Sequence, residues 1–304
     1  MGENLSFILP ILRLYQNNEF NKKNNQKLIL MLPIEFKPQN EYELIRLGQD
    51  NDGGYLVDKK SIDDSKSLIT LGLGFDWTFE KNYYALTARP VYCYDHSVNY
   101  STIKKRCRKL LSSYLFRVFK PKYFLQKNFF KFLLRDIFLY RNYKKFFKNK
   151  NVDHKQERIG TGDQCVKLKK ILDERKSDLP AFIKIDIEGS EYRIFDEILL
   201  NQKNFTGIGI ELHDVDIHMD KIKNFIKNLD MDLIHIHPQN PAHVAENDIP
   251  TQLELTFAKN PKIISSEVKL PHKLDQPANP YLKEIELIFE KKSKLKCQLL
   301  LKNN

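Results

Sequence analysis

Short apolar runs alternate with longer amphipathic segments along much of the chain, and this alternation predicts an α/β fold. Residues 68–71 are mostly apolar and predict a buried strand, and residues 91–94 predict a second one. The segment 76–89 between them predicts a helix. Strand, helix and strand in this order are typical of an open parallel sheet with helices on its faces.

The same alternation resumes at Arg158, where residues 158–163 predict the end of a strand and a turn. Asp163 is expected to be the N-cap of a helix that runs through Leu172. The stretch 180–191 predicts a strand that closes on an acidic turn, and the stretch 206–214 predicts another that ends in polar groups. A helix is predicted at 192–200, and another follows the strand at 206–214 and ends at Leu229. A closing pair of strands is predicted at 232–237 and 251–257.

A turn lies ahead of the first strand of this series. The segment 44–57 joins two apolar runs through Asp52-Gly-Gly-Tyr55, which is a turn signal. The simplest interpretation is a plain hairpin. Because the segment immediately precedes the strand at 68–71, the rim or lid of a ligand pocket is the alternative.

The turn Gly72-Leu73-Gly74 follows the first strand and is typical of a loop that seats a nucleotide-like cofactor. Alone it is a weak signal, since tight turns with two glycines are common. The second strand strengthens it, because that strand ends at Asp95, about twenty residues further on. An acid at that distance can accept hydrogen bonds from ribose hydroxyls.

Charges near this turn favour a cationic cofactor. A dinucleotide fingerprint would have a third glycine where this chain has Trp77, and it would place a pyrophosphate at the helix start. Asp76 and Glu80 lie in that first turn and would repel phosphates. We therefore expect S-adenosylmethionine, which has positive sulfonium and α-ammonium groups and no phosphate, near Asp76 and Glu80.

Polar residues also follow the later strands. In open α/β sheets, ligands bind at the carboxyl ends of the strands. Five side chains at such ends are expected to converge on one acidic crevice, which would suit a cationic cofactor: Asp95, Asp186, Glu188, Glu211 and His213.

Size and cysteine content narrow the class of protein. A chain of 304 residues, 41% hydrophobic, can form one large α/β domain with additions. Its four cysteines include no Cys-x-x-Cys pair, which favours a reducing compartment over a disulfide framework or a zinc ribbon. No apolar run approaches the roughly twenty residues of a membrane span, and the N-terminus lacks a signal-peptide pattern. We therefore expect a cytoplasmic protein.

Positive charge is concentrated in one insertion. Residues 101–160 contain eighteen Lys or Arg and three acids, although the whole chain has a net charge of +11. Aromatic residues recur among them at broadly helical spacing, so the simplest interpretation is amphipathic helices packed on the core. The alternatives are a lid over an acceptor site and a membrane-peripheral contact of residues 101–150 with anionic lipid. Nucleic acid is less favoured, because no RNA-binding signature is present.

The nine residues Ile183-Lys-Ile-Asp-Ile-Glu-Gly-Ser-Glu191 resemble the signature of the FkbM-type family of S-adenosylmethionine-dependent methyltransferases, Ile-Asp-x-Glu-Gly-x-Glu. The similarity extends from about Ile45 to Phe257. It implies a class I (Rossmann-like) fold, with a seven-stranded sheet, helices on both faces and an antiparallel last strand. The implied organisation is an N-terminal cap (1–43), a methyltransferase domain (44–259) with the basic insertion (101–155), and a C-terminal tail (260–304).

The resemblance also implies an activity, namely O-methylation of a hydroxyl on a sugar or glycan such as a surface polysaccharide or a lipid-linked precursor. By position, Gly72 and Gly74 would lie against the cofactor and Asp95 would bind its ribose. Asp163 would reach the adenine amino group, and Asp186 would lie near the methionine end and the transferred methyl.

Methyl transfer to oxygen needs an aligned acceptor and a group that removes its proton. His213 or Asp186 is the expected base, and the plainer interpretation of His213 is a histidine that only hydrogen-bonds the strand end. A divalent metal that orients a sugar diol is a further hypothesis. Its candidate ligands are Asp186, Glu211, His213 and His237.

Two rival functions come from other classes. One is an NAD-dependent sugar enzyme, which Trp77 and the acidic helix start oppose. The other is a membrane- or nucleic-acid-binding adaptor on a degenerate methyltransferase fold, which Asp95 and the motif at 183–191 oppose. The sequence predicts neither the identity of the acceptor nor the oligomeric state.

Overall fold

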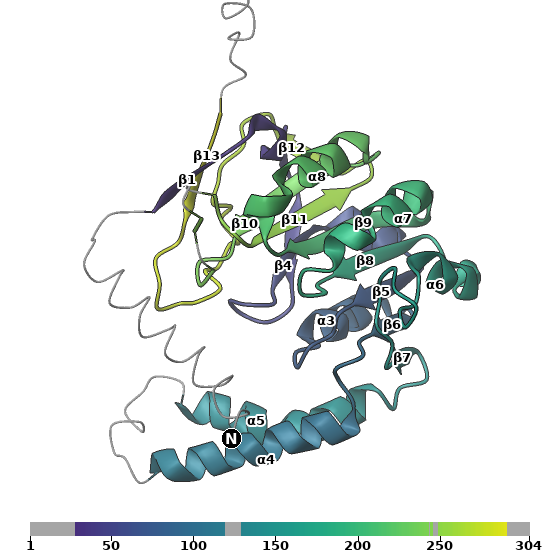
Figure 1. The fold of residues 1–304 in the computed structure, drawn as a ribbon, viewed down its shortest axis with the longest axis vertical. Coiled ribbons are helices and arrows are strands. Elements are labelled where there is room, and N and C mark those ends of the chain that lie inside the picture. Colours follow the sequence, from purple (N-terminus) through teal and green to yellow (C-terminus); the bar gives the residue numbers. More distant parts are fainter. Residues whose placement is uncertain (1–27, 119–128, 243, 246–248, 291–304) are drawn as a thin grey trace, which may run out of the picture. The chain divides into compact units, whose positions relative to one another are not determined.

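A seven-stranded sheet organises the fold (Figure 1), which we describe from a computed structural model for residues 28–118, 129–242, 244–245 and 249–290. In space the strands follow the order β10-β11-β9-β8-β5-β6-β7. β11 is antiparallel to both of its neighbours, whereas β5 pairs in parallel with β6 and β8, and β6 with β7. The predicted seven-stranded α/β sheet with an antiparallel last strand is therefore confirmed. The strands are β5 (Ser67–Leu71), β6 (Val91–Tyr94), β7 (Val152–Lys155), β8 (Ala181–Ile185), β9 (Phe205–Leu212), β10 (Asp232–Pro238) and β11 (Leu253–Ala258).

The chain forms two compact units, and residues 63–206 make up one of them. Every residue of β5 and β8 is buried, which explains why both strands are near-continuous apolar runs. α3 ends where Ala88 adopts a left-handed conformation, φ 54°. Apart from the two helices of the basic insertion, the helices of this unit are α3 (Thr78–Thr87), α6 (Leu168–Glu174) and α7 (Phe195–Asn201). Short 3₁₀ turns lie at Lys176–Asp178, Glu191–Arg193 and Gln202–Asn204.

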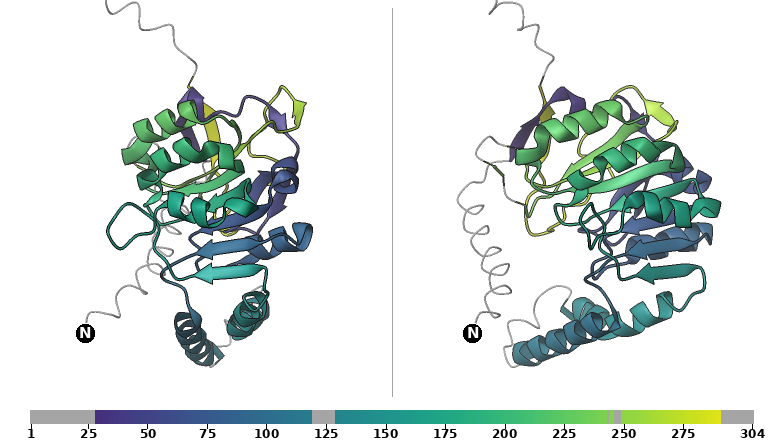
Figure 2. Two further views of the ribbon diagram at one scale, coloured as in Figure 1. Left: turned by 90° about the vertical axis from the view of Figure 1, so that its right-hand side faces the viewer. Right: turned by 45° about the vertical axis from the view of Figure 1, so that its right-hand side comes forward.

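The basic insertion forms two long helices, α4 (Tyr100–Val118) and α5 (Phe129–Phe146), as predicted. Its last residues, 152–155, were included in the predicted helical insertion but form strand β7 instead. The predicted segment 119–128 lies outside the described residues. The two helices run side by side, as the views in Figure 2 show. Part of the aromatic content packs inward as expected. Tyr143 is 3% exposed and its ring centroid lies 5.3 Å from that of Trp77 and 4.5 Å from that of Phe147.

In residues 152–172 the structure contradicts the prediction for Asp163 and contains a strand, β7, that the sequence did not predict. Asp163 does not cap a helix, because α6 begins only at Leu168, with Lys167 as its N-cap, and Asp163 is exposed in a turn. A backbone hydrogen bond from Cys165 to Gly162 (2.8 Å) closes that turn before the helix starts. Strand β7 was not predicted, because its sequence, Val-Asp-His-Lys, has no apolar run and only its first residue is buried.

The other unit contains the described residues within 1–62 and 207–304. The hairpin predicted around Asp52-Gly-Gly-Tyr55 is present, with β3 (Leu44–Leu47) antiparallel to β4 (Tyr55–Asp58). β1 (Ile29–Leu32) pairs in parallel with β13 (Glu286–Phe289), so the segments expected as cap and tail share a small sheet. The other elements are a 3₁₀ turn at Ile34–Phe36, β2 (Glu41–Tyr42), α2 (Lys59–Asp64), α8 (Val215–Asn228) and β12 (Ile263–Ser265). Within the described residues, none of the helices is both long and apolar enough to cross a membrane.

Candidate functional site

The glycine turn after β5 is fixed by close backbone packing. Gly72 has φ +83°, and a Cβ at this position would lie 1.6 Å from the carbonyl oxygen of Asp186. Its N–H donates to the carbonyl oxygen of Tyr94 (2.9 Å). Only glycine fits here, because the backbone of β5 meets the ends of β6 and β8 at this point. Gly74 also has a positive φ, +59°, but a Cβ there would have no neighbour within 4 Å.

Asp95 holds this turn. Its Oδ2 accepts hydrogen bonds from the N–H groups of Leu73 and Gly74, both at 2.9 Å. Its Oδ1 accepts from the N–H and the hydroxyl of Ser97, both at 2.7 Å. Although burial would raise the pKa of Asp95, these hydrogen bonds outweigh it and lower the pKa. Within the protein, Asp95 therefore holds the glycine turn in place. The expected contact with the ribose of a cofactor stays a prediction.

The acidic turn after β8 is held by its own last residue. Glu191 is fully buried, and its Oε1 accepts from the N–H groups of Ile187 (3.0 Å) and Gly189 (3.2 Å). Within the turn, Glu188 and Gly189 have positive φ values, 54° and 89°. The motif at 183–191 therefore contains one acid that holds the turn, Glu191, and two acids near the strand end, Asp186 and Glu188.

These two turns border one cleft of about 580 Å³, a volume that includes its open mouth. Asp95, Asp186 and Glu188 meet there, as their positions after β6 and β8 predicted. Sequence reasoning missed Glu157 and Arg158, which also line the cleft. They follow the polar strand β7. The sequence predicted a strand end and a turn from Arg158 to Asp163, but it gave these two side chains no role in a ligand site.

The cleft is acidic. Its described lining carries four carboxylates and one guanidinium, together with His96, so a cation is favoured over an anion. Backbone and side-chain atoms of Gly72, Tyr94, Ser97, Ile159, Ile187 and Ser190 complete the lining.

Asp76 and Glu80 do not line this cleft, contrary to expectation. Asp76 lies two residues before α3, and its Oδ1 accepts from the N–H of Thr78 (3.1 Å). Glu80 points into the core, because its position in the helix faces the sheet. Its Oε1 accepts from the Thr70 hydroxyl (2.9 Å) and lies 4.0 Å from Lys184 Nζ, and burial raises its pKa. Asp163 is likewise absent from the lining.

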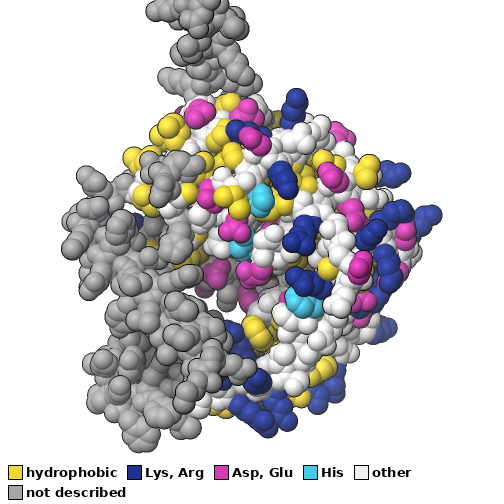
Figure 3. Space-filling model, viewed as in Figure 1, with side chains coloured by type: hydrophobic (Ala, Val, Ile, Leu, Met, Phe, Trp, Pro, Cys, Tyr) yellow, Lys and Arg dark blue, Asp and Glu magenta, His cyan; other side chains and the backbone are white. Residues whose placement is uncertain are grey.

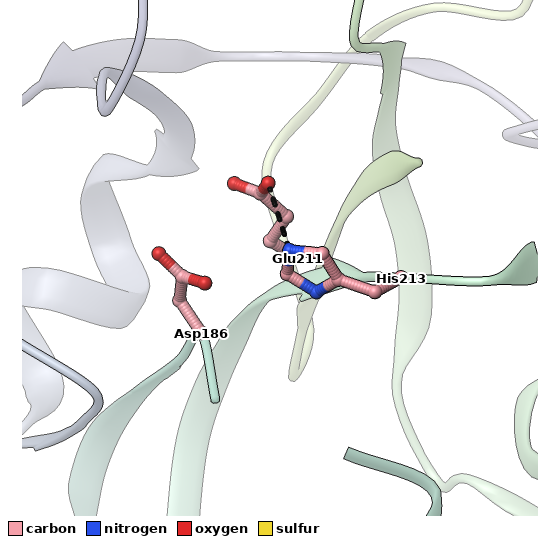
Figure 4. A group of neighbouring side chains, drawn as sticks. All are labelled: Asp186, Glu211 and His213. Carbon is pink, nitrogen blue, oxygen red and sulfur yellow. Dashed lines mark ion pairs between the residues drawn. The ribbon is translucent and has the colours of Figure 1, made fainter. Parts of the chain in front are cut away.

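A second group of polar side chains lies at the end of β9, in the other unit. His213 Nε2 lies 3.6 Å from Glu211 Oε1, the pair that the dashed line marks in Figure 4. The Tyr55 hydroxyl donates to Glu211 Oε2 (3.4 Å), and both members of the pair are largely shielded from solvent. A carboxylate beside an imidazole orients the ring, as in many general bases. Asp186, also drawn in Figure 4, belongs to residues 63–206.

His237 is engaged on both ring nitrogens. Nδ1 lies 3.9 Å from Glu254 Oε2, and Nε2 lies 3.3 Å from Glu284 Oε2. Burial would lower the pKa of His237, but the carboxylates outweigh it and raise the pKa. Burial also raises the pKa of Glu254, to about 7. This arrangement does not offer His237 as a metal ligand, and the metal hypothesis for the other three candidates stays a prediction.

Comparison with known proteins identifies a family. The model of the methyltransferase FkbM domain matches residues 21–233. Curated proteins give no match. Similar solved structures include a chain of a fibrillarin/Nop5p complex (10% identity, 64% of this chain and 73% of that chain covered, TM-score 0.33). Another is precorrin-6y C5,15-methyltransferase from Geobacter metallireducens (11% identity, 64% of this chain and 81% of that chain covered, TM-score 0.34). A third is M. jannaschii TYW2 in complex with AdoMet (9% identity, 72% of this chain and 94% of that chain covered, TM-score 0.29).

Proposed function

We propose, since the chain belongs to the methyltransferase FkbM family, that it transfers the methyl group of S-adenosylmethionine to a hydroxyl of a sugar or glycan. A surface polysaccharide or a lipid-linked precursor is the acceptor that we expect. The family supports methyl transfer, whereas the donor, the oxygen acceptor and the sugar are our own inference.

The acidic cleft beside the glycine turn is the observation that carries the proposal. S-Adenosylmethionine has a sulfonium and an α-ammonium group, and four carboxylates against one guanidinium favour both. The same charges disfavour the pyrophosphate of NAD. The groups present therefore fit the donor, with Gly72 lining the cleft and Asp95 keeping the glycine turn in place.

Bound S-adenosylmethionine would supply an already activated methyl group, so the side chains have to align the acceptor oxygen and remove its proton. We assign Asp186 to the methionine end of the donor. The base is His213 or Asp186. His213 is our first choice, because Glu211 orients its ring and an imidazole exchanges protons near neutral pH.

Mass spectrometry of a surface-glycan extract, incubated with the full chain and methyl-labelled S-adenosylmethionine, tests this function. We expect labelled methyl ethers on sugar residues, and none when an Asp186→Asn variant replaces the wild type. Label only on RNA, protein or nitrogen atoms, or no label on any glycan or lipid-linked sugar, would overturn the proposed acceptor class.

A further inference from the structure

The helices α4 and α5 carry an outward face that combines positive charge with exposed apolar side chains. In Figure 3, Lys and Arg side chains gather at the lower edge of the view, where the described part of this hairpin lies. The segment 101–150 contains sixteen Lys or Arg and one acid, Asp136. This face has no role in the proposed chemistry, so it calls for an explanation of its own.

Helical periodicity sorts the side chains of α5 into two faces. Leu139 and Tyr143 are buried. On the opposite side, residues three and four apart form one exposed stripe, which is apolar in its first half and basic in its second. Leu134, Ile137 and Phe138 are 53%, 40% and 42% exposed. The stripe consists of Leu134, Ile137, Phe138, Arg141, Lys144 and Lys145.

α4 repeats this division. Ile103 and Cys107 are buried, and the residues that follow each of them by one and two positions are basic and exposed. These residues are Lys104, Lys105, Arg108 and Lys109. Both helices of the hairpin therefore turn positive charge outward.

The base of the hairpin is fixed, so the outward face has a defined orientation within its unit. Tyr143 packs edge-on against Trp77, and Arg106 lies over the Phe75 ring, 4.1 Å from the ring centroid. Phe75 and Trp77 follow the glycine turn directly. Packing therefore holds the inner face, and the stripe of α5 is left exposed.

We propose that the outward face of α4 and α5 docks on the surface of a membrane that contains anionic lipid. Basic side chains beside Leu, Ile and Phe suit the boundary between headgroups and acyl chains, where charges meet phosphate and apolar tips enter the hydrocarbon. Nucleic acid would use the charges but would leave aliphatic Leu134 and Ile137 without a contact. A second copy of the chain on the same face would bring like charges together.

Sedimentation of the full chain with lipid vesicles tests this proposal. We expect binding to phosphatidylcholine vesicles that contain phosphatidylserine, and little binding to pure phosphatidylcholine. Raising the salt from about 0.1 M to about 1 M should weaken the binding strongly, because the screening length falls from about 10 Å to about 3 Å. Equal binding to both kinds of vesicle, or none to either, would overturn the proposal.

Variants separate this face from general surface charge. Arg141→Gln, Lys144→Gln and Lys145→Gln together should weaken vesicle binding about a hundredfold, at roughly fivefold for each charge. The matched control is Lys203→Gln, Lys221→Gln and Lys227→Gln, which removes the same charge from exposed lysines elsewhere. Circular dichroism and the unfolding midpoint show that each variant is folded. Equal losses in the two triple variants would contradict the proposal.

A second pair tests the apolar contribution. Leu134→Gln with Phe138→Gln should weaken binding at least about tenfold, because each apolar tip loses its place in the membrane. The control is Leu200→Gln with Ile217→Gln, at side chains that are 80% and 71% exposed. If the first pair leaves vesicle binding unchanged, or if the chain binds RNA but not vesicles, the surface is not a membrane contact. These readouts do not involve methyl transfer, so they stand or fall independently of the proposed function.

Discussion

The carbonyl oxygen of Asp186 occupies the place where a side chain on Gly72 would begin, 1.6 Å from its ideal Cβ. This contact joins the glycine turn after β5 to the acidic turn after β8. Both turns line the cleft. The position of the acids therefore depends on the absence of a side chain at residue 72.

Gly72→Ala should accordingly destabilise the chain by about 2–4 kcal/mol, because it combines a backbone clash with a positive φ. The matched control is Gly74→Ala, where only the φ of +59° is unfavourable and about 1 kcal/mol is expected. Urea unfolding measures both values. Equal losses in the two variants would show that the contact with Asp186 is not tight.

Asp95→Asn tests the clamp on the glycine turn. The amide nitrogen would face backbone donors, so we expect a loss of about 2–4 kcal/mol at pH 7. Because the pKa of Asp95 is lowered in the folded state, its contribution is complete above the ordinary value of 3.8. It is lost as the pH falls through the lowered pKa. The stability difference between wild type and variant, measured by urea unfolding, should therefore shrink below about pH 4. A difference that stays constant down to pH 2 would contradict this role.

Glu254 and His237 should make stability depend on pH in the opposite direction. A carboxyl whose pKa is raised to about 7 keeps its proton in the folded state, so stability is lost as the pH rises from its ordinary pKa of 4.5 towards 7. The raised pKa of His237 adds a loss as the pH rises through that pKa, above 6.5. Besides each other, the groups that face the pair are Arg46, Asp52, Asp275 and Glu284.

Glu254→Gln should therefore flatten the fall in unfolding free energy between pH 5 and pH 8. Gln239 Nε2, which donates to Glu254 Oε1 (2.5 Å), keeps an acceptor in this variant. Exposed Glu267→Gln is the control and should leave the profile of the wild type unchanged. Parallel profiles for wild type and Glu254→Gln would mean that the buried pair does not titrate in this range.

The choice between the two candidate bases can be made kinetically. If His213 removes the proton, His213→Ala should lower kcat by about 10²- to 10⁴-fold with little change in donor affinity. Tyr55→Phe removes the hydroxyl that contacts Glu211 and should lower kcat less, since Glu211 still lies beside His213. A His213→Ala variant with normal kcat would transfer the role to Asp186.

The sheet could be predicted because its buried strands have a clear sequence pattern. β5, β8 and β9 lie inside the sheet and are apolar along most of their length, which is typical of strands buried on both faces. β7 lies at the end of the sheet with three partly exposed residues, and no apolar period marks it. Glu157 and Arg158 follow this strand and line the cleft. The sequence predicted a strand end and turn from Arg158 on, but residue type alone did not place these two side chains in a ligand site.

The candidate site was predicted less well, because residue type and spacing do not determine where a side chain points. Asp95 and Asp186 follow buried strands, so topology alone brings them to the cleft. Glu80 lies in the first turn of α3, on the side of the helix that faces the sheet, and contacts Thr70 and Lys184 instead. Asp is a residue type that often caps helices, but Asp163 lies in a turn closed by the hydrogen bond between Cys165 and Gly162, and the helix begins only at Leu168.

Calorimetric titration with S-adenosylmethionine and S-adenosylhomocysteine tests the central claim most directly, since the two differ by the methyl group and the positive charge on sulfur. The wild type should bind both. Asp186→Asn should weaken S-adenosylmethionine more than S-adenosylhomocysteine, whereas Asp173→Asn, at an exposed carboxylate on α6, should change neither. If S-adenosylmethionine does not bind, or if Asp186→Asn weakens both ligands equally, the cleft is not a seat for a positively charged methyl donor.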